Sequence, residues 1–113
     1  MQHVFKYLAA TKDLMLCYGP SSDGTGLQIF SDADYADVDS ARSTSSHTVF
    51  VGHNLVNWSS KRQAVVAKST TEAEYIAADN AGSDGVWFRN FMSELGYPPS
   101  GATPLWLDNQ SAI

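Results

Sequence analysis

The chain has 113 residues, 43% of them hydrophobic, and this length supports one modest core and therefore one domain or a piece of one. Its net charge of −5 excludes a general electrostatic attraction to nucleic acid, so any such binding has to use a local basic patch or metal ions. Because the single Cys17 permits no internal disulfide and no apolar run reaches membrane-spanning length, we expect a soluble intracellular protein of the cytoplasm or nucleus, without membrane contact.

The first 26 residues are predicted to form a connection segment and a linker. Val4, Phe5 and Leu8 recur at helical spacing within residues 2–10, and the alternating apolar residues of 14–18 favour a short strand. Residues 19–26 are rich in Gly, Pro and Ser and have no periodicity, which indicates a linker. We therefore expect the compact domain to occupy residues 27–113.

The rest of the chain alternates apolar runs with turn signals, a pattern typical of an α/β domain. The expected elements, in order, are a strand at 27–32, an Asp-rich loop to 39, strands at 44–51 and 55–58 joined by a turn at 52–54, a polar and basic segment at 59–68, a helix at 70–95 with a weak point at 82–85, and a last strand at 103–108. Gly96, followed by two prolines, is expected to end the helix.

Two aspartates and one glutamate stand out by their places in these elements. Asp32 and Asp108 each end an apolar strand, and strands of α/β folds deliver such residues to an edge where sites gather. At 100° per residue, Glu74 lies on the apolar face of the helix, where a carboxylate is costly unless it is paired or binds a metal. The other residues of that face are Ala73, Ala77, Ala81, Phe88, Phe91, Met92 and Leu95. We therefore predict that the three carboxylates converge on a hard divalent cation.

The neighbouring acidic residues have simpler interpretations. Glu72 lies about 160° from Glu74 around the helix and completes a capping-box pattern with Ser69, so it is interpreted as structural. The aspartates at 32, 34, 37 and 39 suggest a calcium loop, but the required Gly and the Glu at the end of such a loop are absent. We interpret all but Asp32 as solvated loop residues. Taken alone, Asp108 is better interpreted as a strand-end or helix-capping residue, and the alternative for Glu74 is a semi-exposed residue at the edge of its face.

Five sequence blocks occur in an order that resembles a known domain. They are SDADYA at 31–36, RSTS at 42–45, WSSKRQ at 58–63, STTEAEY at 69–75 and LDNQSAI at 107–113. Together they resemble the ribonuclease H domain of copia-type retrotransposon Pol polyproteins. Residues 3–18 are similar to the stretch that joins the reverse transcriptase to that domain, so the resemblance covers nearly the whole chain.

This resemblance implies a ribonuclease H-like α/β fold, with three antiparallel strands, a long helix and a fourth strand parallel to the first. It implies that Asp32, Glu74 and Asp108 hold two Mg²⁺ or Mn²⁺ ions and that the domain hydrolyses the RNA strand of an RNA–DNA hybrid. Residues expected to contact the nucleic acid, through hydroxyls, amides or cations, are Ser43, Thr44, Ser45, Lys61, Arg62, Asn109 and Gln110.

Several of these residues keep an alternative interpretation. Lys61, Arg62 and Lys68 form either a phosphate contact or a solvated loop. Trp58 either stacks on nucleic acid or, as strand residues more often do, packs in the core. His47 is interpreted as a strand or turn residue without a metal role.

The resemblance leaves open whether the chain is an enzyme. The family has a fourth acidic ligand, a last strand and C-terminal helices, which we expect to be missing beyond Ile113. One hypothesis is therefore a ribonuclease H with impaired activity, and the other is an inactive relic used as a nucleic-acid-binding or protein-interaction module. An open edge at strand 103–108 further predicts either a homodimer or capping by strand 14–18 of the same chain.

Overall fold

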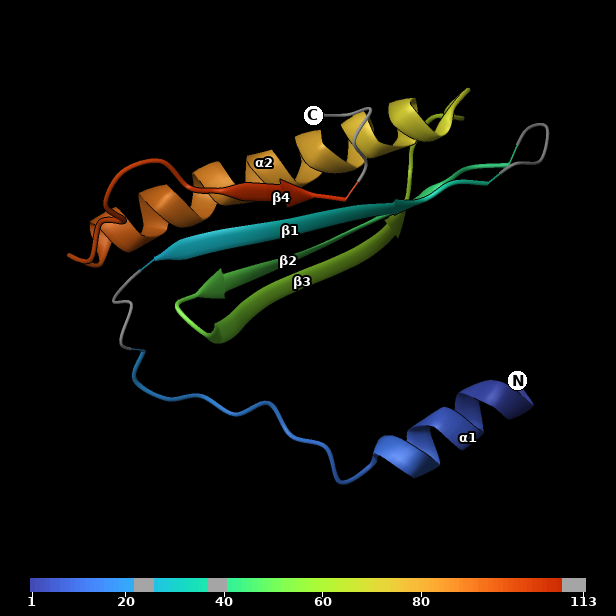
Figure 1. Cartoon of the computed structure of the whole chain (residues 1–113), viewed down its shortest axis with the longest axis horizontal. Helices are drawn as coiled ribbons and strands as arrows, with labels where there is room; N and C mark the ends of the chain where they lie inside the picture. Colours follow the sequence, from blue (N-terminus) through green and yellow to red (C-terminus); the bar gives the residue numbers. More distant parts are fainter. Residues whose placement is uncertain (22–25, 37–40, 109–113) are drawn as a thin grey trace.

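The computed structural model describes residues 1–21, 26–36 and 41–108, in which one long helix packs on a four-stranded sheet (Figure 1). The elements are α1 (Gln2–Thr11), β1 (Leu27–Asp34), β2 (Thr44–Val51), β3 (Asn54–Arg62), α2 (Thr70–Glu94) and β4 (Leu105–Leu107). The strand order is β3-β2-β1-β4, with β1–β2 and β2–β3 antiparallel and β4 parallel to β1. The predicted α/β class and its mixed sheet are therefore confirmed.

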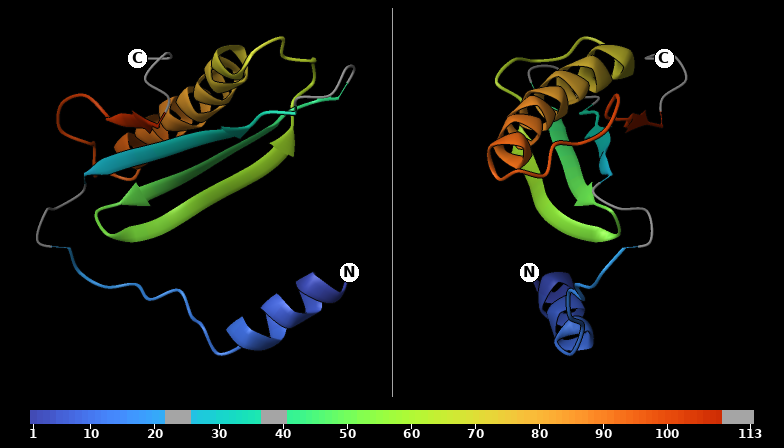
Figure 2. Two further views of the ribbon diagram at one scale, coloured as in Figure 1. Left: turned by 45° about the vertical axis from the view of Figure 1, so that its right-hand side comes forward. Right: turned by 90° about the vertical axis from the view of Figure 1, so that its left-hand side faces the viewer.

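The three antiparallel strands form because inward and outward side chains alternate along them. Leu27 and Ile29 of β1 and Val49 of β2 are buried and form the core with Ala81 and Met92 of α2. The turn between β2 and β3 begins at Gly52, whose φ of 60° is a left-handed conformation that favours glycine. Figure 2 shows that α2 covers one face of this sheet.

The third strand is longer than its apolar pattern predicts. We expected it to end at Trp58, but it continues to Arg62 because its polar end pairs through the backbone with the start of β2. The pairs Ser45–Lys61 and Thr44–Arg62 extend the ladder to the sheet end that also carries Asp32. Part of the predicted basic loop is therefore strand.

Helix α2 begins and ends where the sequence predicts. The Ser69 hydroxyl accepts a hydrogen bond from the backbone N–H of Glu72 at 3.1 Å, which caps the first turn. Gly96, with φ of 88°, follows the helix, and the next N–H donates to the carbonyl of Met92 at 2.9 Å, as in a Schellman motif. The hydrogen bond of Glu72 differs from that in a standard capping box, because the Glu72 carboxylate accepts from the backbone N–H of Lys68 rather than from that of Ser69.

The expected weak point at residues 82–85 is wrong, because α2 is continuous through it. Gly85 is buried against β1, and a Cβ built on it would overlap the Cδ1 atom of Ile29. The glycine therefore permits a close approach of helix and sheet, which offsets its low helix propensity.

The N-terminal segment contains the expected helix but lacks the expected strand at 14–18. No residue of α1 is buried, and α1 stands clear of the sheet in every view (Figures 1 and 2). The Tyr18 hydroxyl donates to the carbonyl of Leu55 at 2.7 Å, and Gly19 and the Asn54 side chain exchange two hydrogen bonds. These contacts are with β3 at the far side of the sheet, so the predicted capping of the last strand by this segment is wrong.

Strand β4 is shorter than predicted, with three residues rather than six, and it lies at one edge of the sheet. Trp106 is 53% exposed and stacks on Phe30 of β1 at a ring-centroid distance of 6.3 Å. The Arg89 side chain donates to the Thr103 hydroxyl at 2.7 Å and ties the approach to this strand to α2. None of the helices in the described residues is long and apolar enough to cross a membrane.

Candidate metal centre

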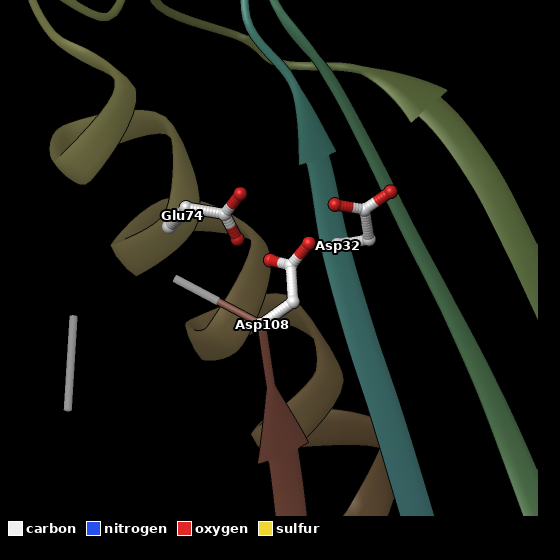
Figure 3. A group of neighbouring side chains, drawn as sticks. All are labelled: Asp32, Glu74 and Asp108. Carbon is white, nitrogen blue, oxygen red and sulfur yellow. The ribbon is translucent and has the colours of Figure 1, made fainter. Parts of the chain in front are cut away.

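Three carboxylates meet where β1, β4 and α2 come together (Figure 3). Asp32 lies on β1, Asp108 directly follows β4, and Glu74 lies near the beginning of α2. One oxygen from each carboxylate can be chosen so that all three atoms lie within 4.8 Å of one another. The structure therefore brings together the three residues that the sequence singled out.

Strand pairing explains why the two aspartates are neighbours. β4 runs parallel to β1, and its register pairs Leu107 with Ser31. The next residue on each strand is an aspartate, so two carboxylates leave the same end of the sheet side by side. Glu74 reaches them because the beginning of α2 packs over this end, as Figure 3 shows.

The environment of Glu74 differs from that of its two neighbours. Glu74 is only 5% exposed, whereas both aspartates are exposed. Burial raises the pKa of Glu74 most, and the negative charges of Asp108 and Asp32 raise it further, while a backbone hydrogen bond from Ala33 opposes the rise. Its Oε2 atom is buried and has no hydrogen-bond partner among the described residues.

This donor set fits a hard divalent cation. Mg²⁺ and Mn²⁺ prefer carboxylate oxygens, and a cation would supply the partner that Glu74 Oε2 lacks and offset the repulsion among three negative groups. The two exposed aspartates leave the remaining side of such an ion open to solvent or substrate.

The residues predicted to contact nucleic acid differ in their exposure to solvent. Lys61 and Arg62 are exposed at the end of β3, and Thr44 beside them is half-buried. Ser43 and Ser45 are buried: the first hydroxyl accepts from the N–H of Ala36, and the second accepts from the side-chain amide of Gln63. Asn109 and Gln110 lie outside the described residues, as do Asp37 and Asp39 of the considered calcium loop.

A polar cleft of about 330 Å³ adjoins Lys61 and Arg62 on the helix side of the sheet. The buried ring of His47 contacts the Asp84 carboxylate at 2.8 Å, and the Asn57 amide donates to the same oxygen at 3.2 Å. The sequence pattern indicates that His47 is a strand or turn residue, and it does not predict this contact. Its place two residues before Val49, on the inward side of a strand, is the signal that could have indicated contact with the helix.

Trp58 lies on the opposite face of the sheet from α2. It is 61% exposed and lines a shallow pocket with Asp32, Ser46 and Ser60. The interpretation of Trp58 as a core residue is therefore wrong, and its ring is available at the surface.

The topology and the carboxylate cluster together define an α/β domain compatible with a ribonuclease H-like fold. Over nearly its whole length, the chain is homologous to retrovirus-related Pol polyproteins of plant transposons. It is 36% identical over 113 residues, or 99% of this chain, to the Pol polyprotein from transposon RE2 of Arabidopsis thaliana. It is 38% identical over 111 residues, or 97% of this chain, to that from transposon TNT 1-94 of Nicotiana tabacum.

The chain spans about 8% of the length of each of these polyproteins. It is also 39% identical over 89 residues to secreted RxLR effector protein 161 of Plasmopara viticola, a match that covers 77% of this chain and 61% of that protein. No family model and no solved structure matches the chain.

Proposed function

We propose that this chain is a retrotransposon-derived ribonuclease H domain that uses divalent metal ions to hydrolyse the RNA strand of RNA–DNA hybrids. The observation that carries the proposal is the approach of Asp32, Glu74 and Asp108 to within 4.8 Å from three separate elements. The order of the five sequence blocks supports the same assignment, and the homology to retrovirus-related Pol polyproteins supports a retrotransposon origin.

The three carboxylates would hold the metal ions. A pair of Mg²⁺ ions supplies a water nucleophile at neutral pH and stabilises the leaving oxygen of a phosphodiester. The protein's own part is to fix the ligands: Glu74 is held in the core with one oxygen unpaired, and the two aspartates are fixed by the pairing of β1 with β4. Ligands held in this way need little rearrangement when a substrate phosphate arrives.

An acidic chain needs local positive charge to hold a nucleic-acid backbone. Lys61 and Arg62 supply it at the end of β3, in register with the start of β2 and hence with the end of β1 that carries Asp32. The exposed ring of Trp58 lies on the same sheet face as Asp32 and offers a stacking surface. Lys61 and Arg62 adjoin the cleft on the helix side of the sheet, whereas Trp58 and Asp32 line a pocket on the other face, so a substrate that contacts both groups has to extend across this end of the sheet.

The test is a cleavage assay on an RNA–DNA hybrid labelled on the RNA strand, with Mg²⁺ or Mn²⁺. We expect cleavage of the hybrid but not of duplex DNA, and we expect Asp32→Asn to abolish it. The matched control is Asp34→Asn, since Asp34 is exposed on the same strand and outside the cluster. Equal activity of the two variants, or hybrid binding without cleavage by the unmodified chain in either metal, would contradict the proposal.

A further inference from the structure

An apolar groove lies at the end of the sheet remote from the carboxylates. Its volume is about 580 Å³, and its apolar lining comes from β2, β3 and the C-terminal half of α2. The principal lining residues are Val51, Val56, Phe88, Phe91, Met92 and Leu95. Phe91 is 42% exposed and Leu95 58% exposed, and such a contiguous exposed apolar surface marks an interaction site.

Helix α1 carries a complementary apolar face. Val4, Phe5 and Leu8 lie on one side of this helix at 100° per residue and are all more than half exposed, while His3 and Lys6 lie on the other. An isolated ten-residue helix is marginal in water, because helices of this length gain most of their stability from packing an apolar face. The helix therefore needs a docking surface.

The segment that joins α1 to the groove directs the helix away from it. Tyr18 and Gly19 line the groove and are fixed there by their hydrogen bonds to Leu55 and Asn54. A turn at Lys12–Asp13 follows the helix, in which the N–H of Leu14 donates to the carbonyl of Thr11 at 3.0 Å, and residues 14–18 then form neither helix nor strand. These five residues span up to about 3.3–3.6 Å each and lead away from the anchored Tyr18, so that α1 stands clear of the sheet that forms the groove (Figures 1 and 2).

We propose that the groove receives α1 of a second copy of this chain and that the exchange is reciprocal. Each copy then buries Val4, Phe5 and Leu8 of its partner against Phe91 and Leu95, in a two-fold symmetric dimer. Exchange of an identical element between protomers is a low-cost route to dimers, because each protomer already contains both complementary surfaces. The carboxylate cluster lies at the other end of the sheet, so this interface is independent of the proposed activity.

The experiment measures the mass of the full 113-residue chain in solution by light scattering over a concentration series, with reducing agent to keep Cys17 free. We expect the unmodified chain to approach twice its monomer mass. The arm variant is Phe5→Ser/Leu8→Ser, and the groove variant is Phe91→Ser/Leu95→Ser. Each should raise the dissociation constant by about 10,000-fold, because the symmetric dimer then loses four buried large side chains, two from each copy, and each contributes roughly tenfold or more.

Matched control variants test whether the dimer depends on the apolar face of α1 and on the groove in particular. His3→Ser/Lys6→Ser alters the other side of α1, and Val86→Ser removes an exposed apolar side chain of α2 outside the groove, so both should leave the dimer intact. All the substituted side chains are exposed, so each variant should keep its fold, which circular dichroism checks.

Mixing the arm variant with the groove variant distinguishes exchange from docking within one chain. The mixed dimer contains one intact helix facing one intact groove, so we expect the mixture to form dimers that neither variant forms alone. A mixture that stays monomeric, an unmodified chain that stays monomeric at every concentration, or an arm variant that dimerises normally would each overturn the proposal.

Discussion

Replacing Glu74 by Gln should stabilise the metal-free protein. The substitution removes the negative charge of a side chain that is 5% exposed. It thereby removes the repulsion between this charge and those of Asp32 and Asp108, whose carboxylate oxygens lie within 4.8 Å. At that distance one carboxylate pair repels by about 0.9 kcal/mol in bulk water and about 3.5 kcal/mol at an effective dielectric of 20. Because both aspartates are exposed, we take values near the lower limit and expect a gain of about 1–2 kcal/mol, or about 4–16 °C in Tm.

The pH dependence of stability follows from the direction of the pKa shift. The folded state raises the pKa of Glu74 above its usual 4.5, so the native state binds the proton more tightly than the unfolded state. The stability contributed by the protonated group is fully present below pH 4.5 and is lost as the pH rises through the higher folded pKa. The metal-free wild type should therefore lose stability over this interval, whereas Glu74→Gln should lack this loss.

Divalent metal should reverse the ranking of the two proteins. A cation that binds only the native state at 100 times its dissociation constant adds about 2.7 kcal/mol. Thermal melts followed by circular dichroism in EDTA, Mg²⁺ and Mn²⁺ should show a rise in Tm for the wild type and none for Glu74→Gln. The control Glu72→Gln removes an exposed carboxylate of the same helix and should keep the rise. An equal metal response in the two variants would refute the assignment of Glu74 as a ligand.

Three further predictions concern the fold and the substrate surface. Gly85→Ala should destabilise the protein by about 1–3 kcal/mol in urea titration, because its Cβ meets Ile29, whereas Gly82→Ala meets open space and should be neutral or stabilising by up to about 1 kcal/mol. Ser69→Ala should cost about 1 kcal/mol in the same titration through loss of the helix cap, and an unchanged midpoint would contradict that role. Lys61→Ala should weaken binding of an RNA–DNA hybrid, measured by fluorescence anisotropy. It should also reduce the slope of log affinity against log salt concentration by about one, because one phosphate contact is lost.

Local sequence patterns were sufficient where burial follows a simple period. The bounds of α2 follow from the cap at Ser69 and the glycine at position 96, and the placement of Glu74 rather than Glu72 on the buried face follows from helical phase alone. The approach of Asp32 to Asp108 was predictable because both end apolar strands, although periodicity alone could not supply the parallel register that makes them neighbours.

The errors occurred where backbone pairing or exposure overrode side-chain pattern. Residues 59–62 are polar, yet they are strand because β2 offers a complete hydrogen-bonding partner. Leu14, Leu16 and Tyr18 are spaced like one face of a strand, but they pair with no strand in the described residues. The Tyr18 hydroxyl and the adjacent Gly19 contact β3 instead. Trp58 is exposed because α2 covers only one face of the sheet, and a single-strand pattern does not tell which face is covered.

Because β4 is a short edge strand, the carboxylate cluster depends on whether β4 stays paired with β1. Asp108 is positioned by three paired residues and by the Thr103–Arg89 hydrogen bond, whereas the other two carboxylates belong to long, well-packed elements. Detachment of β4 would therefore remove one ligand while the rest of the sheet stays folded, and such local openings cost far less than global unfolding. A bound cation would tie the edge strand to the helix across the sheet, so that amide exchange at Leu105–Leu107 records ion occupancy directly.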